Sequence, residues 1–220
     1  MTDEQIVLLG GLWLTPSTWD GVVAELTGRG RRAVPVDLSG ATLDDQVNAA
    51  LAVVDAAEGA SVVVGHSAAC ALAWLVADAR PTKVAKVVMI GGFPKADGES
   101  YADFFPPENG VMAFPGWEPF EGADSADLTP AARADFSAKA VPVPEGVSKA
   151  IVHLSDERRF DVPVVLVCPE FSPAEAREWI DSGDLPELAK AKHIELVDID
   201  SGHWPQLTKP AELARILADA

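Results

Sequence analysis

The sequence has little that would suit a nucleic-acid-binding or membrane protein. Its 17 basic residues are outnumbered by 34 acidic ones, and the formal net charge of −17 repels phosphate backbones and anionic lipid surfaces. No uninterrupted apolar run approaches the roughly 20 residues that are needed to cross a bilayer. We therefore predict a protein with no nucleic-acid partner and no membrane partner.

Cysteine is also scarce, with only Cys70 and Cys168 in the 220 residues. Both lie inside apolar runs, which favours buried thiols in a reducing compartment over a disulfide framework. No CxxC pair or Cys/His cluster indicates a zinc site. The N-terminal Met-Thr-Asp-Glu-Gln has neither the basic region nor the apolar stretch of a signal peptide. We expect a cytoplasmic protein without metal or cofactor.

What the chain does contain is a regular alternation of two patterns. Short runs rich in Val and Ile, without polar alternation, are typical of strands buried on both faces of a parallel sheet. They are residues 6–9, 33–36, 61–64, 86–90, 162–167 and 194–197. Between them, apolar residues recur at helical spacing over residues 17–28, 43–57, 68–79 and 208–219. The alternation predicts an α/β fold, a doubly wound and mostly parallel sheet of about six strands with flanking helices.

The alternation is interrupted once, over residues 92–160. This segment has no convincing buried strand, and helical patterns occur only near 128–138 and 145–155. A long insertion in a compact domain is usually functional, often a lid. Its density of aromatics favours a packed cap over a disordered loop; these are Phe104, Phe105, Phe114, Trp117 and Phe120. We predict one domain over residues 1–220 with a cap insertion at 92–160.

The clearest local signal for chemistry is Val62-Val63-Val64-Gly65-His66-Ser67-Ala68-Ala69, which runs from a predicted strand into a buried helix. It resembles the Gly-x-Ser-x-Gly nucleophile elbow, with Ala69 in place of the last glycine. Such a turn lifts a serine hydroxyl clear of the sheet, and small flanking residues let the helix pack closely. We predict Ser67 as a nucleophile.

A serine nucleophile needs a base, and His203 is the best placed histidine. It follows the last predicted strand in Asp200-Ser201-Gly202-His203-Trp204-Pro205, so its loop lies at the same sheet edge as Ser67. The other histidines have structural interpretations. His66 supports the packing of the elbow, His153 lies on a predicted helix of the cap, and His193 opens a strand.

Several segments, in order along the chain, resemble the α/β-hydrolase fold superfamily over essentially the whole length. They are Leu8-Leu9-Gly10-Gly11-Leu12-Trp13, Trp19 and Leu26, Val36-Asp37-Leu38-Ser39-Gly40, residues 65–69, and Gly202-His203-Trp204-Pro205. Compared with the full fold, the chain begins at what would be the third strand, so we expect a minimal version that lacks the first antiparallel hairpin.

The resemblance implies an oxyanion hole made of two backbone N–H groups. One would belong to Ala68, the residue after the nucleophile, and the other to Leu12, with Trp13 as the next choice. Such donors are worth about 3–4 kcal/mol each. Gly10 replaces the histidine that is usual in this turn, which removes a side chain but no backbone donor.

The acid that orients the histidine is the weak point of the pattern. The family expects it in the loop after residues 162–167, and Glu170 is the only carboxylate in that turn. We therefore predict Glu170 as the third catalytic residue. The alternatives left open are Asp97, Asp198, Asp200, or a Ser–His dyad with no acid. Asp37 is interpreted as structural.

Aromatic side chains suggest an apolar substrate pocket, with Trp13, Trp117 and Trp204 as its predicted lining. No Arg or Lys is evident near the catalytic loops. These features favour an uncharged ester, thioester or lactone, a small apolar molecule cleaved through an acyl-enzyme on Ser67. Two alternatives remain open, namely chemistry of the hydroxynitrile-lyase type at the same Ser/His site and a non-catalytic binding protein. The oligomeric state is also open, with a homodimer as one option.

Overall fold

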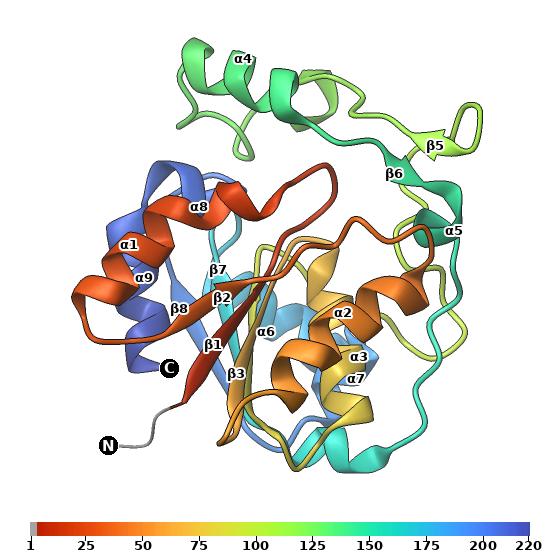
Figure 1. Ribbon diagram of the computed structural model, residues 1–220, viewed down its shortest axis with the longest axis vertical. Helices are drawn as coiled ribbons and strands as arrows, with labels where there is room; N and C mark the ends of the chain where they lie inside the picture. Colours follow the sequence, from red (N-terminus) through yellow and green to blue (C-terminus); the bar gives the residue numbers. More distant parts are fainter. Residues whose placement is uncertain (1–3) are drawn as a thin grey trace.

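A six-stranded parallel sheet forms the centre of the molecule in a computed structural model that describes residues 4–220 (Figure 1). The strand order is β2-β1-β3-β4-β7-β8, and each neighbouring pair is parallel. The strands are β1 (Gln5–Leu9), β2 (Ala33–Pro35), β3 (Ser61–His66), β4 (Val84–Ile90), β7 (Val164–Cys168) and β8 (Ile194–Asp198). The predicted doubly wound parallel sheet is confirmed. The first three residues of the polar N-terminus lie outside the described residues.

The order of the strands changes direction next to β1. The chain passes from β1 to β2 on one side, and then crosses back to place β3 on the other side of β1. The loops that follow β1 and β3 therefore separate at this point, at the carboxyl edge of the sheet. In open α/β sheets, ligands bind at such a switch point. Leu12 follows β1 and Ser67 follows β3, so the topology brings both to this edge.

Helices cover both faces of the sheet. Alternate strand residues point to opposite faces, so Ile6 and Leu8 pack with one helical layer, whereas Val7 and Leu9 pack with the other. The first layer contains α1 (Asp20–Gly28) and α9 (Pro210–Asp219). The second contains α2 (Leu43–Asp55), α3 (Ala69–Ala79), α6 (Pro173–Ser182) and α7 (Pro186–Lys190). Helix α3 is buried along almost its whole length, as its apolar sequence predicts.

Local sequence signals explain several helix ends. Thr42 and Asp45 form a capping box at α2, and Ser172 and Glu175 form another at α6. Helix α6 ends at Gly183, whose φ of 85° is in the left-handed region. The predicted helix over 17–28 begins with a 3₁₀ turn, η1 (Pro16–Trp19), and a short helix, α8 (Pro205–Thr208), precedes α9.

Residues 92–160, called the cap segment below, contain a small antiparallel pair and short helices. The pair β5 (Val111–Met112) and β6 (Val143–Pro144) and helix α4 (Pro130–Lys139) lie beyond the carboxyl ends of the core strands (Figure 1). The segment also contains η2 (Glu118–Phe120), α5 (Glu145–Ser148) and η3 (Glu157–Asp161). The pattern near 128–138 corresponds to α4. The predicted helix over 145–155 is wrong beyond Ser148, because the chain there pairs with another extended segment.

That pairing joins the two ends of the cap segment. The amide of Gly98 donates to Val152 O over 2.9 Å, and the amide of Val152 donates to Glu99 O over 2.8 Å. Further along, the amide of Tyr101 donates to Ala150 O over 2.8 Å. Residues 98–102 and 148–152 therefore lie side by side, where the chain leaves and re-enters the core. His153, expected on a helix, lies just after this pairing and is exposed.

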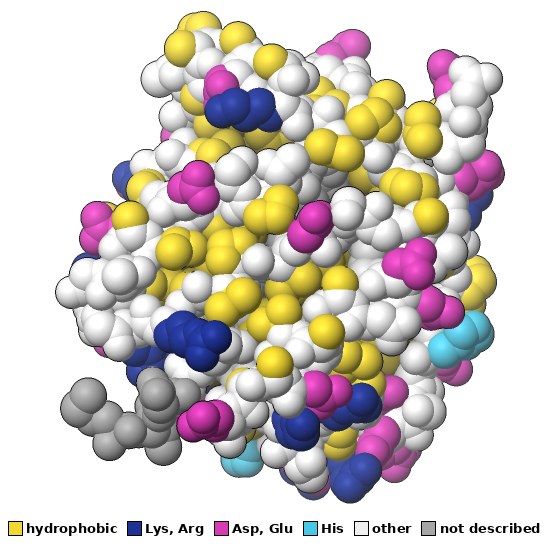
Figure 2. Space-filling view, viewed as in Figure 1, with side chains coloured by type: hydrophobic (Ala, Val, Ile, Leu, Met, Phe, Trp, Pro, Cys, Tyr) yellow, Lys and Arg dark blue, Asp and Glu magenta, His cyan; other side chains and the backbone are white. Residues whose placement is uncertain are grey.

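Acidic side chains are spread over the visible face of the molecule rather than gathered in one patch (Figure 2). Both cysteines are free and buried. Within residues 4–220, no helix has the length and apolar character needed to cross a bilayer. In the same part of the chain, no cluster of His, Cys, Asp and Glu is arranged to hold a metal ion.

Candidate active site

Ser67 occupies a sharp turn between β3 and α3. Its φ is 55°, in the left-handed region that residues with a side chain adopt rarely and that often marks a functional site. Its amide donates to Ile90 O over 2.8 Å. The backbone around Ser67 can pack this closely because residues 65 and 92 are glycines. A Cβ added at Gly65 would lie 2.3 Å from Ala69 O, and a Cβ added at Gly92 would lie 2.4 Å from Ser67 O.

His203 and Glu170 form a direct pair at the same edge of the sheet. Glu170 follows β7, His203 follows β8, and the distance from His203 Nδ1 to Glu170 Oε1 is 2.7 Å. Both side chains are largely buried, at 15% and 16% exposed. A carboxylate beside Nδ1 fixes the tautomer in which Nδ1 carries the hydrogen, which leaves Nε2 of the neutral ring free to accept a proton.

The other carboxylates considered for this position lie elsewhere. Asp97 accepts a hydrogen bond from the amide of Leu154 over 2.9 Å, at the exposed base of the cap segment. Asp37 accepts from the amide of Ser39 in its own turn. Asp198 and Asp200 are exposed. Within residues 4–220, Glu170 is the carboxylate that contacts the His203 ring.

The loop that carries His203 is held from two sides. His66 Nε2 donates to the carbonyl oxygen of His203 over 2.7 Å. From the cap segment, Asp124 O accepts from the amide of His203 over 2.7 Å, and Asp127 accepts from the amide of Gly202 over 2.9 Å. The packing role predicted for His66 therefore extends to a hydrogen bond with the predicted base.

Ser67 and His203 line a common cavity of about 340 Å³. Its other walls include Ala68 after Ser67, Phe93 and Phe104 after β4, Tyr101 at the base of the cap segment, and Leu185 before α7. In the part of the chain that the structure describes, no hydrogen bond joins Ser67 to His203. Such bonds are often long before a substrate is bound.

Two backbone amides near Ser67 are available as donors. Within residues 4–220, the amides of Leu12 and Ala68 make no hydrogen bond to a protein acceptor. The loop of residues 10–14 runs beside the elbow, because an added Cβ at Gly11 would lie 3.0 Å from Ser67 Cβ. Unpaired backbone N–H groups are the donors from which an oxyanion hole is built.

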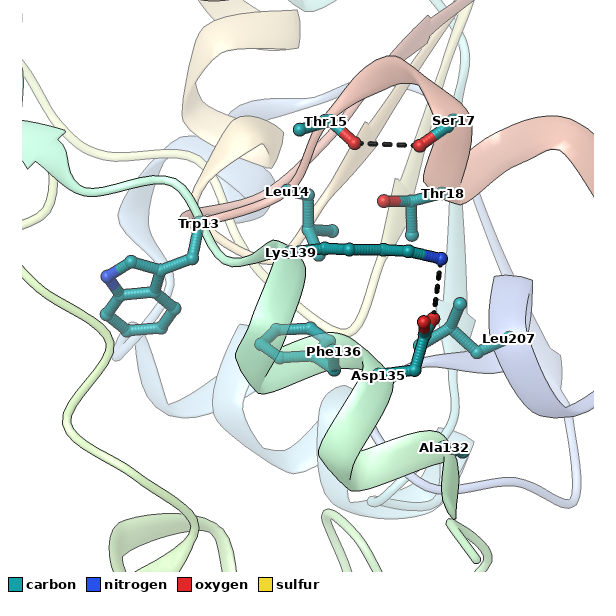
Figure 3. A pocket seen from close by; sticks show the side chains of 10 residues that line it. All are labelled: Trp13, Leu14, Thr15, Ser17, Thr18, Ala132, Asp135, Phe136, Lys139 and Leu207. Atoms are coloured by element: carbon teal, nitrogen blue, oxygen red, sulfur yellow. Dashed lines mark hydrogen bonds and ion pairs between the residues drawn. The ribbon is translucent and has the colours of Figure 1, made fainter.

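The three tryptophans predicted to line the pocket do not line the cavity at Ser67. Trp204 and Trp117 pack on each other at a centroid distance of 5.3 Å, in an aromatic cluster between the cap segment and the core. Trp13 is buried and donates through Nε1 to Met112 O over 3.2 Å. It lines a different cavity of about 170 Å³, between α4 and residues 14–18 (Figure 3).

Lys95 was missed by the sequence reasoning, and the expectation of no basic residue near the catalytic loops is wrong. Lys95 lies five residues beyond the end of β4, is half-buried, and lines the cavity of Ser67. Its Nζ lies 5.6 Å from the centroid of the Phe104 ring. The available signal was its position just after β4, the strand next to the one that ends in the elbow.

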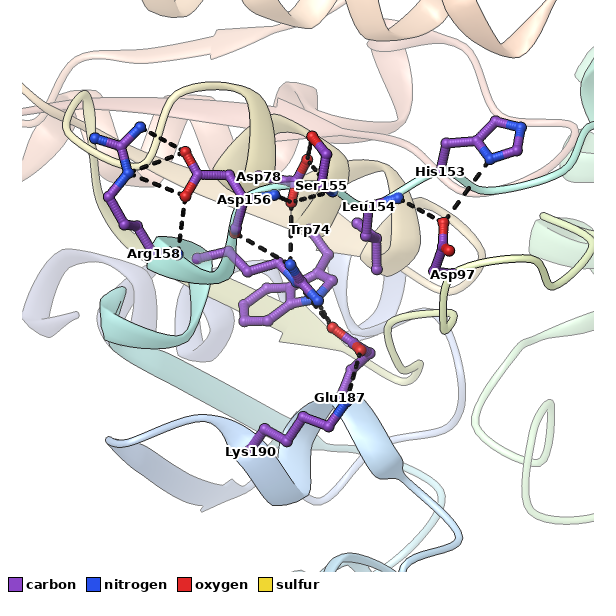
Figure 4. Close-up of polar contacts among 11 residues, drawn as sticks. Trp74, Asp78, Asp97, His153, Leu154, Ser155, Asp156, Arg158, Glu187 and Lys190 are labelled. Carbon is purple, nitrogen blue, oxygen red and sulfur yellow. Dashed lines mark hydrogen bonds and ion pairs between the residues drawn. The ribbon is translucent and has the colours of Figure 1, made fainter.

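A buried network of ion pairs and hydrogen bonds lies beside helix α3 (Figure 4). Arg159 Nε donates to Glu187 Oε2 over 2.9 Å, and Arg159 Nη1 donates to Asp78 over 3.2 Å. Trp74 donates to the same Glu187 oxygen over 2.9 Å. The network ties α3, the helix of the elbow, to α7 and to the end of the cap segment. Nothing in the sequence pattern indicated it.

Residues 6–216 match a family described as the alpha/beta hydrolase family, and the chain belongs to that family. A comparison with curated protein sequences found no significant match.

Solved structures share the fold at low sequence identity. A pyrethroid hydrolase from Sphingobium faniae JZ-2 is 18% identical with a TM-score of 0.72, over 98% of this chain and 96% of that chain. An extracellular α/β-hydrolase from a Paenibacillus species is 18% identical with a TM-score of 0.75, over 99% and 98%. A methylesterase from Arabidopsis is 16% identical with a TM-score of 0.75, over 98% and 98%.

Proposed function

We propose that the protein is a serine hydrolase that cleaves an uncharged ester, thioester or lactone through an acyl-enzyme on Ser67. His203 is the general base and Glu170 orients it. The observation that carries this proposal is the 2.7 Å contact between His203 Nδ1 and Glu170, made by a histidine that lines the cavity of Ser67. Ser67 and His203 come from two loops and line one cavity, and Glu170, from a third loop, contacts His203; acyl transfer uses a nucleophile, a base and an orienting group in this order.

In the proposed reaction, Ser67 Oγ attacks the carbonyl carbon of the substrate and His203 Nε2 takes the serine proton. The amides of Leu12 and Ala68 stabilise the negative oxygen of the tetrahedral intermediate. The C–O or C–S bond then breaks, and His203 gives its proton to the leaving alcohol or thiol. His203 next activates a water molecule that attacks the acyl carbon and releases the acid from Ser67.

Apolar side chains in the cavity wall support a small substrate with an apolar part, and the charged side chains of Lys95, Glu99 and Asp184 line the same cavity. Phe93, Phe104 and Leu185 line it together with Ser67, and its volume of about 340 Å³ admits a compact molecule. Among the similar structures, one is described as a pyrethroid hydrolase and another as a methylesterase, which supports hydrolysis of an ester. We further propose a cytoplasmic location and a cap segment, residues 92–160, that acts as a lid within one domain.

The test combines a fluorophosphonate probe with steady-state turnover of p-nitrophenyl acetate and butyrate. Wild type should be labelled and should turn over the esters. Ser67→Ala should lose labelling and about 10⁶-fold in kcat, and His203→Ala a similar factor. Ser17→Ala, which removes the hydroxyl of an exposed serine, serves as the matched control and should behave like wild type.

Full activity in Ser67→Ala would overturn the proposal. Cyanide release from a cyanohydrin without any ester turnover would support lyase chemistry at the same residues instead. A wild type that neither reacts with the probe nor turns over any ester would support a binding protein.

A further inference from the structure

Tyr101 is the only tyrosine of the chain and lies at the base of the cap segment. It is 2% exposed, although it borders two cavities. Its backbone is fixed, because its amide donates to Ala150 O over 2.8 Å in the pairing that joins the two ends of the cap segment. The ring itself packs in the hydrophobic core, which leaves the side chain little freedom to move.

The two cavities that Tyr101 borders are those of the two candidate oxyanion donors. One is the cavity of Ser67 and Ala68. The other, of about 110 Å³, lies along the loop that carries Leu12. Among the described residues, Tyr101 is the only one that lines both. Tyr101 therefore borders the cavity of each of the two amides on which the proposed function depends.

The hydroxyl of Tyr101 is without a protein partner. In residues 4–220, it makes no hydrogen bond to another residue, and it is not among the unpaired side-chain atoms that are sealed from solvent. The hydroxyl is therefore free to donate to a molecule bound in a cavity that Tyr101 lines. Burial also raises the pKa of the Tyr101 phenol, so the group stays protonated and can donate.

We propose that Tyr101 Oη donates a hydrogen bond to the carbonyl oxygen of the substrate as Ser67 attacks it, as a third donor beside the amides of Leu12 and Ala68. The proton remains on the phenol throughout, so no proton or bond is exchanged with Tyr101. The assignment rests on the proposed function of Ser67. It makes Tyr101 a catalytic residue, whose contribution grows as negative charge develops on the oxygen.

The experiment compares wild type with Tyr101→Phe, which keeps the ring and removes only the hydroxyl. With p-nitrophenyl butyrate, kcat should fall about 10²-fold while KM changes little, because the bond strengthens in the transition state. A trifluoromethyl ketone forms a hemiketal oxyanion on a reactive serine, and its affinity should fall by a similar factor. The thermal unfolding midpoint should remain that of wild type.

Ser39→Ala is the matched control, since it removes a hydroxyl that lines only the cavity along the Leu12 loop. Its kcat and inhibitor affinity should equal those of wild type. If wild type is active and Tyr101→Phe matches it in both measurements, the Tyr101 assignment fails while the proposed function stands. If wild type neither reacts with the probe nor turns over esters, both fail.

A measurement on wild type covers the case in which Tyr101→Phe does not fold. With carbon-13 at the tyrosine Cζ, the single tyrosine gives a single NMR resonance. Binding of the trifluoromethyl ketone should shift this resonance as the phenol donates to the oxyanion. A resonance that stays in place on saturation with the inhibitor would overturn the assignment.

Discussion

His66 and His203 are joined by a hydrogen bond from the ring of the first to the backbone of the second. His66 Nε2 donates to His203 O over 2.7 Å, and a carbonyl can only accept, so Nε2 carries the hydrogen. Burial lowers the pKa of His66 to about 3, and the positive charge of a protonated His203 adds to that effect. The residue before Ser67 is therefore a neutral imidazole that holds the loop of the proposed base.

The first prediction concerns the pH dependence of stability. Above pH 6.5, His66 is neutral in the folded and the unfolded chain, whereas between pH 6.5 and about 3 only the unfolded chain binds the proton. The free energy of unfolding should therefore fall as the pH is lowered through this window, by up to about 1.4 kcal/mol per pH unit from this group. Urea unfolding at pH 7 and pH 5 measures it.

His66→Gln removes the titration and keeps an amide that can donate to a carbonyl. The difference in unfolding free energy between pH 7 and pH 5 should be smaller in His66→Gln than in wild type. His153→Gln, at a side chain that is 82% exposed, is the control and should retain the wild-type difference. Equal pH dependence in His66→Gln and wild type would contradict the prediction.

The second prediction separates Glu170 from the other carboxylates. Glu170→Gln places a neutral amide beside His203 Nδ1 and removes the charge that stabilises the imidazolium, so kcat should fall about 10³–10⁴-fold on p-nitrophenyl esters. Asp97→Asn changes a carboxylate that is 62% exposed and should leave kcat unchanged. Loss of activity in Asp97→Asn together with an active Glu170→Gln would reverse the assignment.

The third prediction concerns the close packing of the elbow. A methyl group at Gly65 would lie 2.3 Å from Ala69 O, and this oxygen belongs to the backbone, so a side-chain rotation cannot relieve the collision. Gly65→Ala should therefore lower the free energy of unfolding by about 3 kcal/mol and weaken labelling by a fluorophosphonate.

Gly59→Ala is the matched control, because a Cβ there would meet no atom within 4 Å. Its unfolding midpoint and its labelling should remain close to those of wild type. A Gly65→Ala protein as stable and reactive as Gly59→Ala would show that the elbow is less tightly packed than the structure indicates.

The fourth prediction compares two neighbouring arginines. Arg159 is 7% exposed and pairs with Asp78 and Glu187, so Arg159→Met removes the buried cation that the two buried carboxylates share. The expected loss in the free energy of unfolding is about 3–5 kcal/mol. Arg158 is 66% exposed, and Arg158→Met should have a far smaller effect in the same urea titration. Similar losses in both variants would contradict this assignment.

The sheet could be predicted from sequence because buried parallel strands have a continuous apolar pattern that few other elements share. Ser67 and His203 could be predicted because each follows a predicted strand, so that their loops lie at the same edge of the sheet. Glu170 could only be selected by elimination, since its orientation depends on the turn after β7. The structure places its oxygen 2.7 Å from His203 Nδ1, and its catalytic role stays a prediction.

The cap segment was harder to interpret because its residues pack on one another. An aromatic residue gives the same sequence signal in a cap core and in a substrate pocket, which is why Trp117 and Trp204 were expected at the cavity and instead pack on each other. Residues 149–155 carry a helical pattern, but pairing with residues 98–102 prevails over it. Lys95 lines the cavity from a loop, and the path of a loop cannot be predicted from the periodicity of apolar residues.

The pairing of residues 98–102 with 148–152 makes the cap segment an exchangeable unit. The chain departs from the core and returns to it at neighbouring points, so a graft between these two strips need not disturb the sheet or the elbow. Substrate range could thus diversify by replacement of one contiguous stretch of gene. Any graft would have to replace the acceptors that the cap segment supplies to the core. They are the carbonyl of Asp124 for the amide of His203, Asp127 for the amide of Gly202, and the carbonyl of Met112 for Trp13 Nε1.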